Sequence, residues 1–228
     1  MLRITQRRFV IIPAGGTGSR MQSDLPKQFL LLNEVPVIIH TLRLFLAVDG
    51  IEKIIVPVAD VWKDYFNELK LKYELPSTIE TVTAGETRFH SVKNALKVLP
   101  DEGMVSIHDA AQPLASKELI EKCFSVTVEK GNAVAAIPLR DSVYKIKKGE
   151  TKSMNRNNYR LAQTPQCFLL SEIKKAFKQE YQKSFTDDAS VYEAAEYKVN
   201  LTEGENTNFK ITNAEDLLFA EIILKNRK

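Results

Sequence analysis

A glycine-rich loop followed by two cations is the part of this sequence best suited to chemistry. The loop reads Ala14-Gly15-Gly16-Thr17-Gly18, and Arg20 and Lys27 come soon after it. Glycines lack the Cβ atoms that would keep backbone amides away from an anion. A triphosphate fits such a loop, because in nucleotidyl transfer the protein mainly positions the phosphates and neutralises their developing charge. The alternative is a tight turn without a ligand, flanked by ordinary surface charges.

The loop matches neither of two common phosphate-binding patterns. The dinucleotide fingerprint requires a third glycine where this chain has Met21, and the Walker A pattern requires a Gly-Lys-Ser/Thr sequence that is absent. No acidic residue follows a second strand at the place that would bind a ribose. These differences argue against the NAD-binding half of a dehydrogenase.

Asp109 is the candidate metal ligand. It directly follows an apolar run at 104–108, so its carboxylate should lie at the carboxyl edge of a sheet, beside the glycine loop. Mg²⁺ is usually held by one or two carboxylates together with phosphate oxygens and water, so one aspartate would suffice. The alternative role is a helix N-cap. His108 is expected to pack beside the sheet, since no second histidine lies at metal-ligand spacing.

Short apolar runs that alternate with helical patterns must position these residues. Strands are predicted at 9–12, 53–58, 78–83, 104–108 and 133–138, and apolar residues at helical spacing lie between them, at 38–46, 92–99 and 119–124. Such alternation predicts a three-layer, Rossmann-like α/β fold with a mostly parallel sheet and sites beyond the carboxyl ends of the strands.

The alternation breaks after Pro138. Residues 141–160 hold two short alternating stretches around a Lys-Lys-Gly-Glu turn, which predicts a protruding β-hairpin arm. The helix-strand pattern is expected to resume at Ser171. A last helix should begin after Asn213, with Glu215 and Asp216 in its first turn and basic residues at its end.

Composition predicts an ordinary globular protein with one domain over 1–228. The chain has 228 residues, of which 44% are apolar and 27% charged, and a net charge of +3. That small excess gives no reason to expect nucleic acid or a membrane as a partner. Cys123 and Cys167 fit neither a disulfide framework nor a zinc site, and the apolar run near the N-terminus is too short for a signal peptide or membrane span. A cytoplasmic protein is expected.

A series of motifs, in order, resembles one enzyme family. The run at 14–29 resembles the signature of sugar- and polyol-phosphate nucleotidyltransferases, and nearly the whole chain resembles the 2-C-methyl-D-erythritol 4-phosphate cytidylyltransferases of the non-mevalonate isoprenoid pathway. The further motifs are Ala84-Gly85-Glu86-Thr87-Arg88 with Ser91, His108-Asp109-Ala110-Ala111-Gln112-Pro113, Arg140-Asp141-Ser142, Asn155-Arg156-Asn157, Thr164-Pro165-Gln166, Thr186-Asp187-Asp188-Ala189-Ser190 and Asn208-Phe209-Lys210-Ile211-Thr212. Each motif is weak alone, but their order is specific.

The resemblance implies a reaction and a role for each matching residue. CTP and the polyol phosphate would give a CDP-polyol and pyrophosphate, with Mg²⁺ on Asp109 and a homodimer whose arms complete shared active sites. Residues 14–18 would bind CTP together with Gly85, Glu86 and Ser91, although these three are also ordinary helix-start residues. Arg20 and Lys27 would neutralise charge on the phosphates. Binding and orientation of the polyol phosphate would fall to Asp109, Gln112, Ser142, Arg156, Thr164, Thr186 and Lys210.

Three positions depart from the family pattern. Gln112 stands where members usually have arginine, Thr207 where they often have aspartate, and Ser142 where many have threonine. The missing cation at Gln112 leaves two interpretations: weaker binding of the polyol phosphate, or a different acceptor such as ribitol 5-phosphate. A third interpretation is a nucleotide-binding regulator without catalytic activity. Such a protein would be expected to lack Arg20, Lys27 or Asp109, and all three are present.

Overall fold

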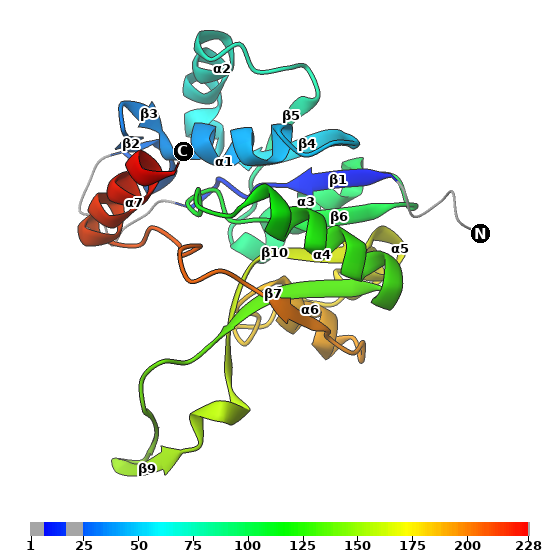
Figure 1. The fold of residues 1–228 in the computed structure, drawn as a ribbon. Helices are drawn as coiled ribbons and strands as arrows, with labels where there is room; N and C mark the ends of the chain where they lie inside the picture. The colour runs from blue at the N-terminus through cyan, green and yellow to red at the C-terminus, as the bar shows by residue number, and fades with distance from the viewer. Residues whose placement is uncertain (1–6, 17–24, 228) are drawn as a thin grey trace.

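The computed structural model describes residues 7–16 and 25–227, which are built around one seven-stranded sheet (Figure 1). Its strands are β1 (Arg8–Ile11), β4 (Ile51–Val58), β5 (Ile79–Thr83), β6 (Met104–Ile107), β7 (Asn132–Pro138), β10 (Arg160–Leu169) and β11 (Leu201–Glu203). Their order across the sheet is β11-β7-β10-β6-β1-β4-β5. β1 pairs in parallel with β4 and β6, whereas β10 runs antiparallel to β6 and β7. The sheet is therefore mostly parallel.

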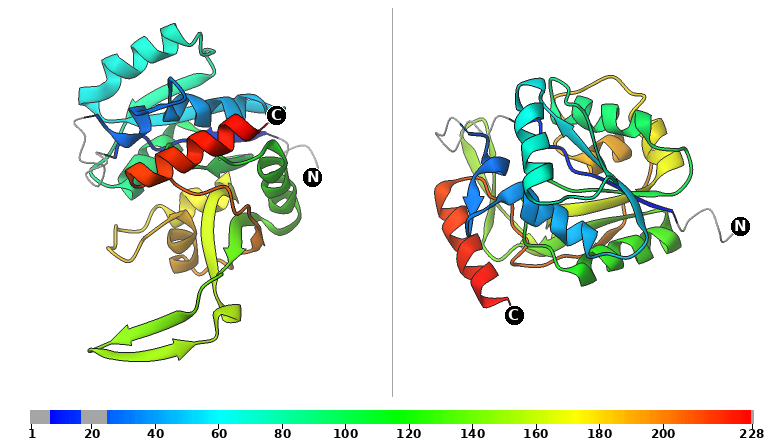
Figure 2. Two further views of the ribbon diagram at one scale, coloured as in Figure 1. Left: turned by 60° about the vertical axis from the view of Figure 1, so that its left-hand side comes forward. Right: turned by 90° about the horizontal axis from the view of Figure 1, so that it is seen from above.

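Helices cover both faces of the sheet (Figure 2). One face packs against α1 (Val37–Leu46), α2 (Lys63–Lys72) and α4 (Lys117–Lys130), and the other against α3 (Arg88–Val98), α5 (Leu170–Ala176) and α6 (Asp188–Ala194). On β1, Val10 belongs to the first core, while Phe9 and Ile11 belong to the second. Successive side chains of a strand point to opposite faces, so this apolar run can fill both cores.

Polar side chains define where several helices begin. The side chains of Thr87, Ser116 and Asp187 accept hydrogen bonds from backbone amides in the first turns of α3, α4 and α6. α7 (Ala214–Asn226) is capped by Asn213, as the sequence predicted, and Asn213 and Asp216 form a reciprocal capping box. Such caps satisfy amides that have no partner within the helix.

A smaller apolar cluster joins the last helix to the region before α1. The 3₁₀ helix η3 (Lys27–Phe29) leads into a two-stranded ribbon of β2 (Leu31–Leu32) and β3 (Val35–Pro36). Leu32 of this ribbon packs in one buried cluster with Ile211 and with Ala220 of α7. α7 therefore lies beside the ribbon rather than on the main sheet (Figures 1 and 2).

The predicted arm is a β-hairpin that extends away from the sheet (Figure 1). It consists of β8 (Val143–Lys147) and β9 (Glu150–Met154), which pair only with each other, followed by the 3₁₀ helix η5 (Arg156–Asn158). The hairpin turns at Lys148 and Gly149, both with positive φ. Tyr144 is 61% exposed and Ile146 is 73% exposed.

The structure confirms the predicted fold class and adds elements that the sequence analysis did not foresee. The five predicted strands, the hairpin and the last helix are all present. β10 was not predicted, so the regular structure resumes at Arg160 rather than at Ser171; α2 and the 3₁₀ helix η4 (Asp60–Trp62) were also missed. None of the helices in the described part of the chain combines the length and apolar character that a membrane crossing requires.

Candidate active site

A pocket of about 280 Å³ opens beyond the carboxyl ends of β1, β5 and β6. It also receives residues from the segment 208–212, which approaches from the far end of the chain. Of the residues predicted from the sequence, those that line the pocket are Gly15, Gly16, Lys27, Gly85, Glu86, Ser91, Asp109 and Lys210. Parallel strands end at one edge of a sheet, so the residues that follow them meet there.

Two glycines allow close packing in the turns after β1 and β5. A Cβ atom on Gly15 would collide with the Cβ of Ala84, and one on Gly85 would collide with His90. The Ser91 hydroxyl accepts a hydrogen bond from the Gly85 amide at 3.0 Å and donates to the Thr87 carbonyl at 3.0 Å. Gly15 thus lets the turns after β1 and β5 approach each other, and Gly85 lets the turn after β5 pack against the first turn of α3. Ser91 holds the turn at Gly85.

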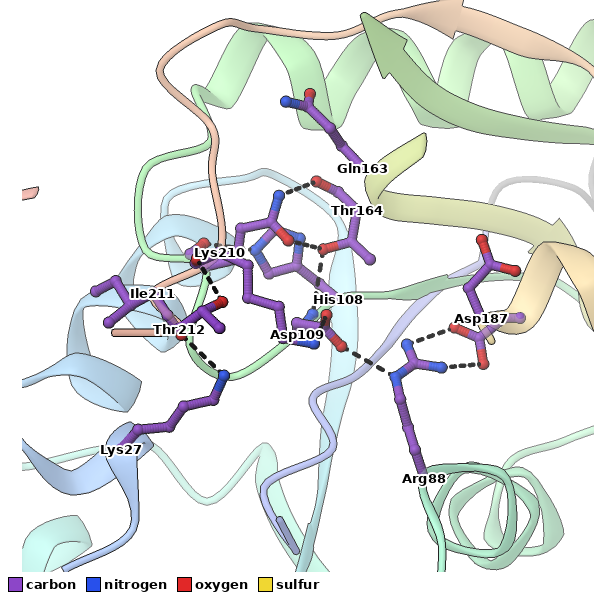
Figure 3. Close-up of polar contacts among 12 residues, drawn as sticks. Lys27, Arg88, His108, Asp109, Gln163, Thr164, Asp187, Lys210, Ile211 and Thr212 are labelled. Atoms are coloured by element: carbon purple, nitrogen blue, oxygen red, sulfur yellow. Dashed lines mark hydrogen bonds and ion pairs between the residues drawn. The ribbon is translucent and has the colours of Figure 1, made fainter. Parts of the chain in front are cut away.

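Asp109 is a carboxylate held between two cations. Arg88 Nε donates to its Oδ1 at 3.0 Å, and Lys210 Nζ donates to its Oδ2 at 2.6 Å (Figure 3). Burial alone would raise the pKa of Asp109, but the charges of Arg88 and Lys210 outweigh it and hold the pKa well below its usual range. Asp109 therefore stays ionised at neutral pH.

Arg88 links Asp109 to a second carboxylate on another helix. Its Nη1 and Nη2 atoms donate to the two oxygens of Asp188 at 2.9 and 2.6 Å. Burial opposes the charge on Arg88, but Asp188 and Asp109 together raise its pKa. This chain of charges fixes the orientation of Asp109 from one side of the pocket.

Two lysines approach the pocket from the opposite side. Lys27 Nζ donates to the carbonyl oxygen of Ile211 at 2.8 Å (Figure 3). The second lysine, Lys210, directly precedes Ile211 in the chain. The Ile211 amide donates to the carbonyl oxygen of Ala111 at 2.8 Å, just after β6. The segment 208–212 is thereby tied to both the Lys27 region and the end of β6.

His108 is a packed residue, as predicted. It is fully buried, its ring lies 5.1 Å from that of Phe45, and its Nε2 lies 2.8 Å from the carbonyl oxygen of Gln112. Burial lowers its pKa to about 4. A neutral imidazole follows at physiological pH.

Other predicted site residues lie away from the pocket lining. Ala14, Gln112 and Thr164 are buried behind it, and Thr186 lies at a separate hollow of about 20 Å³ beside the Arg88–Asp188 pair. Ser142 and Arg156 lie on the arm and do not line the pocket of their own chain. Thr17, Gly18 and Arg20 fall outside the described residues.

The structure also shows pocket residues that the sequence analysis did not assign. The buried side chain of Gln28 donates from Nε2 to the carbonyl oxygens of Ala14 and Gly16 at 2.6 and 2.9 Å, and Thr212 lines the pocket. Gln28 thus holds the described end of the glycine loop. The sequence offered one signal for Gln28, its position immediately after Lys27. Its bonds could not be predicted, because Ala14 and Gly16 lie 14 and 12 positions away in the chain.

The topology and the pocket beyond the parallel strands place the chain among the three-layer α/β proteins that bind nucleotides at that edge. Comparison with known proteins defines the family. The family model described as 2-C-methyl-D-erythritol 4-phosphate cytidylyltransferase (IspD) matches residues 9–226, and the chain belongs to this family.

Relatives and solved structures agree with this assignment. The chain is 39% identical over 217 residues to a 2-C-methyl-D-erythritol 4-phosphate cytidylyltransferase of Phocaeicola vulgatus, covering 95% of this chain and 99% of that protein. It is 38% identical to one of Bacillus velezensis, covering 95% of each. It is also similar to the crystal structure of 4-diphosphocytidyl-2C-methyl-D-erythritol synthase from Anaerococcus prevotii, with a TM-score of 0.83, 28% identity and coverage of 96% and 99%. For the Francisella tularensis cytidylyltransferase the TM-score is 0.79, with 32% identity and coverage of 95% and 99%.

Proposed function

We propose that the chain transfers the cytidylyl group of CTP to 2-C-methyl-D-erythritol 4-phosphate and releases pyrophosphate. An oxygen of the acceptor phosphate forms a bond to the α-phosphorus of CTP, and the bond from that phosphorus to the pyrophosphate breaks. The observation that carries this proposal is the meeting of Lys27, Asp109 and Lys210 in one pocket of a chain that belongs to the cytidylyltransferase family. The acceptor phosphate is already ionised near neutral pH, so the reaction needs no general base.

The pocket residues would divide between two roles, binding of CTP and orientation of the acceptor phosphate. Lys27 would neutralise charge on the CTP phosphates, together with the glycine loop and Arg20, while Gly85, Glu86 and Ser91 would surround the cytosine. Lys210 would orient the acceptor phosphate. Fixed charges of this kind lower the barrier because they are already in place when charge develops in the transition state.

The residues present fit a divalent cation bound together with CTP. Asp109 lines the pocket, and each of its oxygens accepts one hydrogen bond from a protein cation, which leaves a lone pair on each for a metal. We propose that Asp109 holds Mg²⁺ with the phosphate oxygens, as carboxylates commonly do. When bound, the ion would supply Lewis-acid neutralisation of the phosphate charge.

We also propose a homodimer in which each arm serves the pocket of its partner. Ser142 and Arg156 match family motifs but lie on an arm that projects from its own chain (Figure 1). Tyr144 and Ile146 of the same arm are strongly exposed, and a second copy would cover them. Twofold symmetry would deliver both arms at once.

Pyrophosphate release tests this function. The protein is incubated with CTP and Mg²⁺, and 2-C-methyl-D-erythritol 4-phosphate and ribitol 5-phosphate are offered separately. We expect release with the first acceptor. Release only with ribitol 5-phosphate would replace the acceptor, and binding of CTP without release on either acceptor would support a nucleotide-binding regulator.

A further inference from the structure

Gln112 is a buried amide beside the pocket with hydrogen bonds at both ends. Gln112 is only 3% exposed. Its Oε1 accepts a hydrogen bond from the Thr164 hydroxyl at 2.8 Å. Its Nε2 donates to the backbone carbonyl of Asn208 at 2.9 Å and to the side-chain Oδ1 of Asn208 at 3.1 Å. Gln112 thus joins the loop after β6 to β10 and to the segment 208–212.

The two partners of Gln112 are also bonded to each other. The Asn208 side chain donates from Nδ2 to the Thr164 carbonyl at 2.7 Å, and Asn208 is fully buried. The Thr164 hydroxyl, in turn, accepts a hydrogen bond from the Asp109 amide at 3.2 Å. Three buried residues therefore form a closed network of side-chain and backbone hydrogen bonds, which is the arrangement that makes a buried network rigid. We call Gln112, Thr164 and Asn208 the amide latch.

The amide latch lies two residues from Lys210. Asn208 anchors one end of the short stretch that carries Lys210, and Ile211, which is fully buried and donates to the Ala111 carbonyl at 2.8 Å, anchors the other. Both anchors reach the same loop after β6. Lys210 itself is exposed, so its ammonium group depends on the backbone beneath it to stay near Asp109.

We propose that Gln112 is a positioning residue that holds Lys210 in place to orient the acceptor phosphate. Gln112 acts through Asn208 and the backbone of 208–211, and its own amide does not touch the acceptor phosphate. Gln112 therefore has a structural role at the position where the family usually has arginine, and it does not replace the charge of that arginine. The kinetic effect expected from this inference rests on the proposed function. Its structural part, the anchoring of the segment that carries Lys210, does not depend on any substrate.

A matched pair of variants tests the structural part. Gln112→Leu removes both the donor and the acceptor of the buried amide. The control is Asn132→Leu, which removes another buried amide at the start of β7. The Asn132 side chain holds the segment 198–200, because it donates to the Lys198 carbonyl at 2.9 Å and accepts from the Asn200 amide at 2.8 Å. Hydrogen–deuterium exchange should accelerate at residues 208–211 in Gln112→Leu but not in Asn132→Leu. Unchanged exchange there in Gln112→Leu would overturn the proposal, whatever the enzyme's substrate.

Kinetics with Lys210→Met separates positioning from direct contact. We expect Gln112→Leu to raise the KM for the acceptor about tenfold, the loss that follows from one or two weakened polar contacts, with the KM for CTP within about twofold of wild type. In a Lys210→Met background the same change should have little further effect, because residues that act through one another are not additive. An equal rise in acceptor KM in both backgrounds would overturn the proposal, since Gln112 would then act on the acceptor without Lys210.

A milder variant keeps the test available if Gln112→Leu does not fold. Asn208→Ala leaves Gln112 in place, with its bond to the Asn208 backbone carbonyl, and removes one of its side-chain partners. It should give the same split between the two KM values and the same local exchange at 208–211, both to a smaller degree. If the wild-type protein is inactive on every acceptor while the variants show the local exchange, the proposed function is contradicted and the anchoring role is supported.

Discussion

Arg88 and Asp188 form a two-bond ion pair that joins the first turn of α3 to the first turn of α6. The bonds are 2.9 and 2.6 Å long, and the Asp188 side chain is only 1% exposed. The two residues are 100 positions apart in the chain. Since Arg88 also contacts Asp109, the pair connects the packing of two helices on one face of the sheet with the geometry of the pocket.

Loss of Arg88 should therefore destabilise the whole protein. We expect Arg88→Met to lower the free energy of unfolding by about 3–5 kcal/mol, because it leaves the carboxylate of Asp188 buried without its partner. Arg7→Met is the matched control: the Arg7–Glu52 pair has the same chemistry, but its side chains are 46% and 40% exposed. Its loss should cost much less, because solvent screens an exposed ion pair. Denaturant unfolding measures both, and equal costs would contradict the structural role of Arg88.

Lys27 should affect turnover rather than stability. We expect Lys27→Ala to lower kcat by about 10²- to 10³-fold, because it removes a preorganised charge at the reacting phosphates. Lys53→Ala is the control, since Lys53 forms an exposed ion pair with Glu80 on the strands β4 and β5. Steady-state assays of both variants, with thermal unfolding to check folding, decide the matter. Near-wild-type turnover of Lys27→Ala would remove Lys27 from the mechanism.

His108 should make the stability depend on pH below neutrality. Its pKa in the folded protein is lowered to about 4 by burial, below the ordinary value of 6.5. The unfolded chain therefore binds the proton first, so the stabilisation is fully present above about pH 6.5 and is lost as the pH falls toward 4. Between pH 7 and 5 the wild type should lose about 2 kcal/mol more unfolding free energy than His108→Gln. Parallel profiles for the two proteins over that range would show that burial does not lower the pKa of His108 in the folded protein.

Shared active sites should allow two inactive proteins to restore each other. Lys27→Ala and Arg156→Ala are mixed, re-equilibrated and assayed. Random pairing gives half heterodimers, each with one intact pocket, so activity should recover to about a quarter of wild type per total site. No recovery despite confirmed subunit exchange would show that Lys27 and Arg156 act within one chain.

Much of the fold was determined by local patterns that the sequence displays directly. The runs of β1, β6 and β7 and the second half of β4 are short and largely apolar because strands covered on both faces need mostly apolar residues. The hairpin turn at Lys148 and Gly149 and the cap at Asn213 are likewise local, since each depends on residues within one turn. The glycine loop and Asp109 could be identified as candidate site residues because each follows such a strand, and Lys27 because it is a cation soon after the loop.

Other features depend on contacts between distant parts of the chain, and only the tertiary structure decided them. β10 runs antiparallel between β6 and β7, a direction that its own residues do not specify. The bond from Lys210 to Asp109 spans 101 positions, and the bond from Gln112 to Asn208 spans 96. A side chain's charge and donors are visible in the sequence, but its partner is set by which segments pack together. Gln112 shows the difference: as a residue type it is a missing cation, whereas in the fold it is a buried link between three segments.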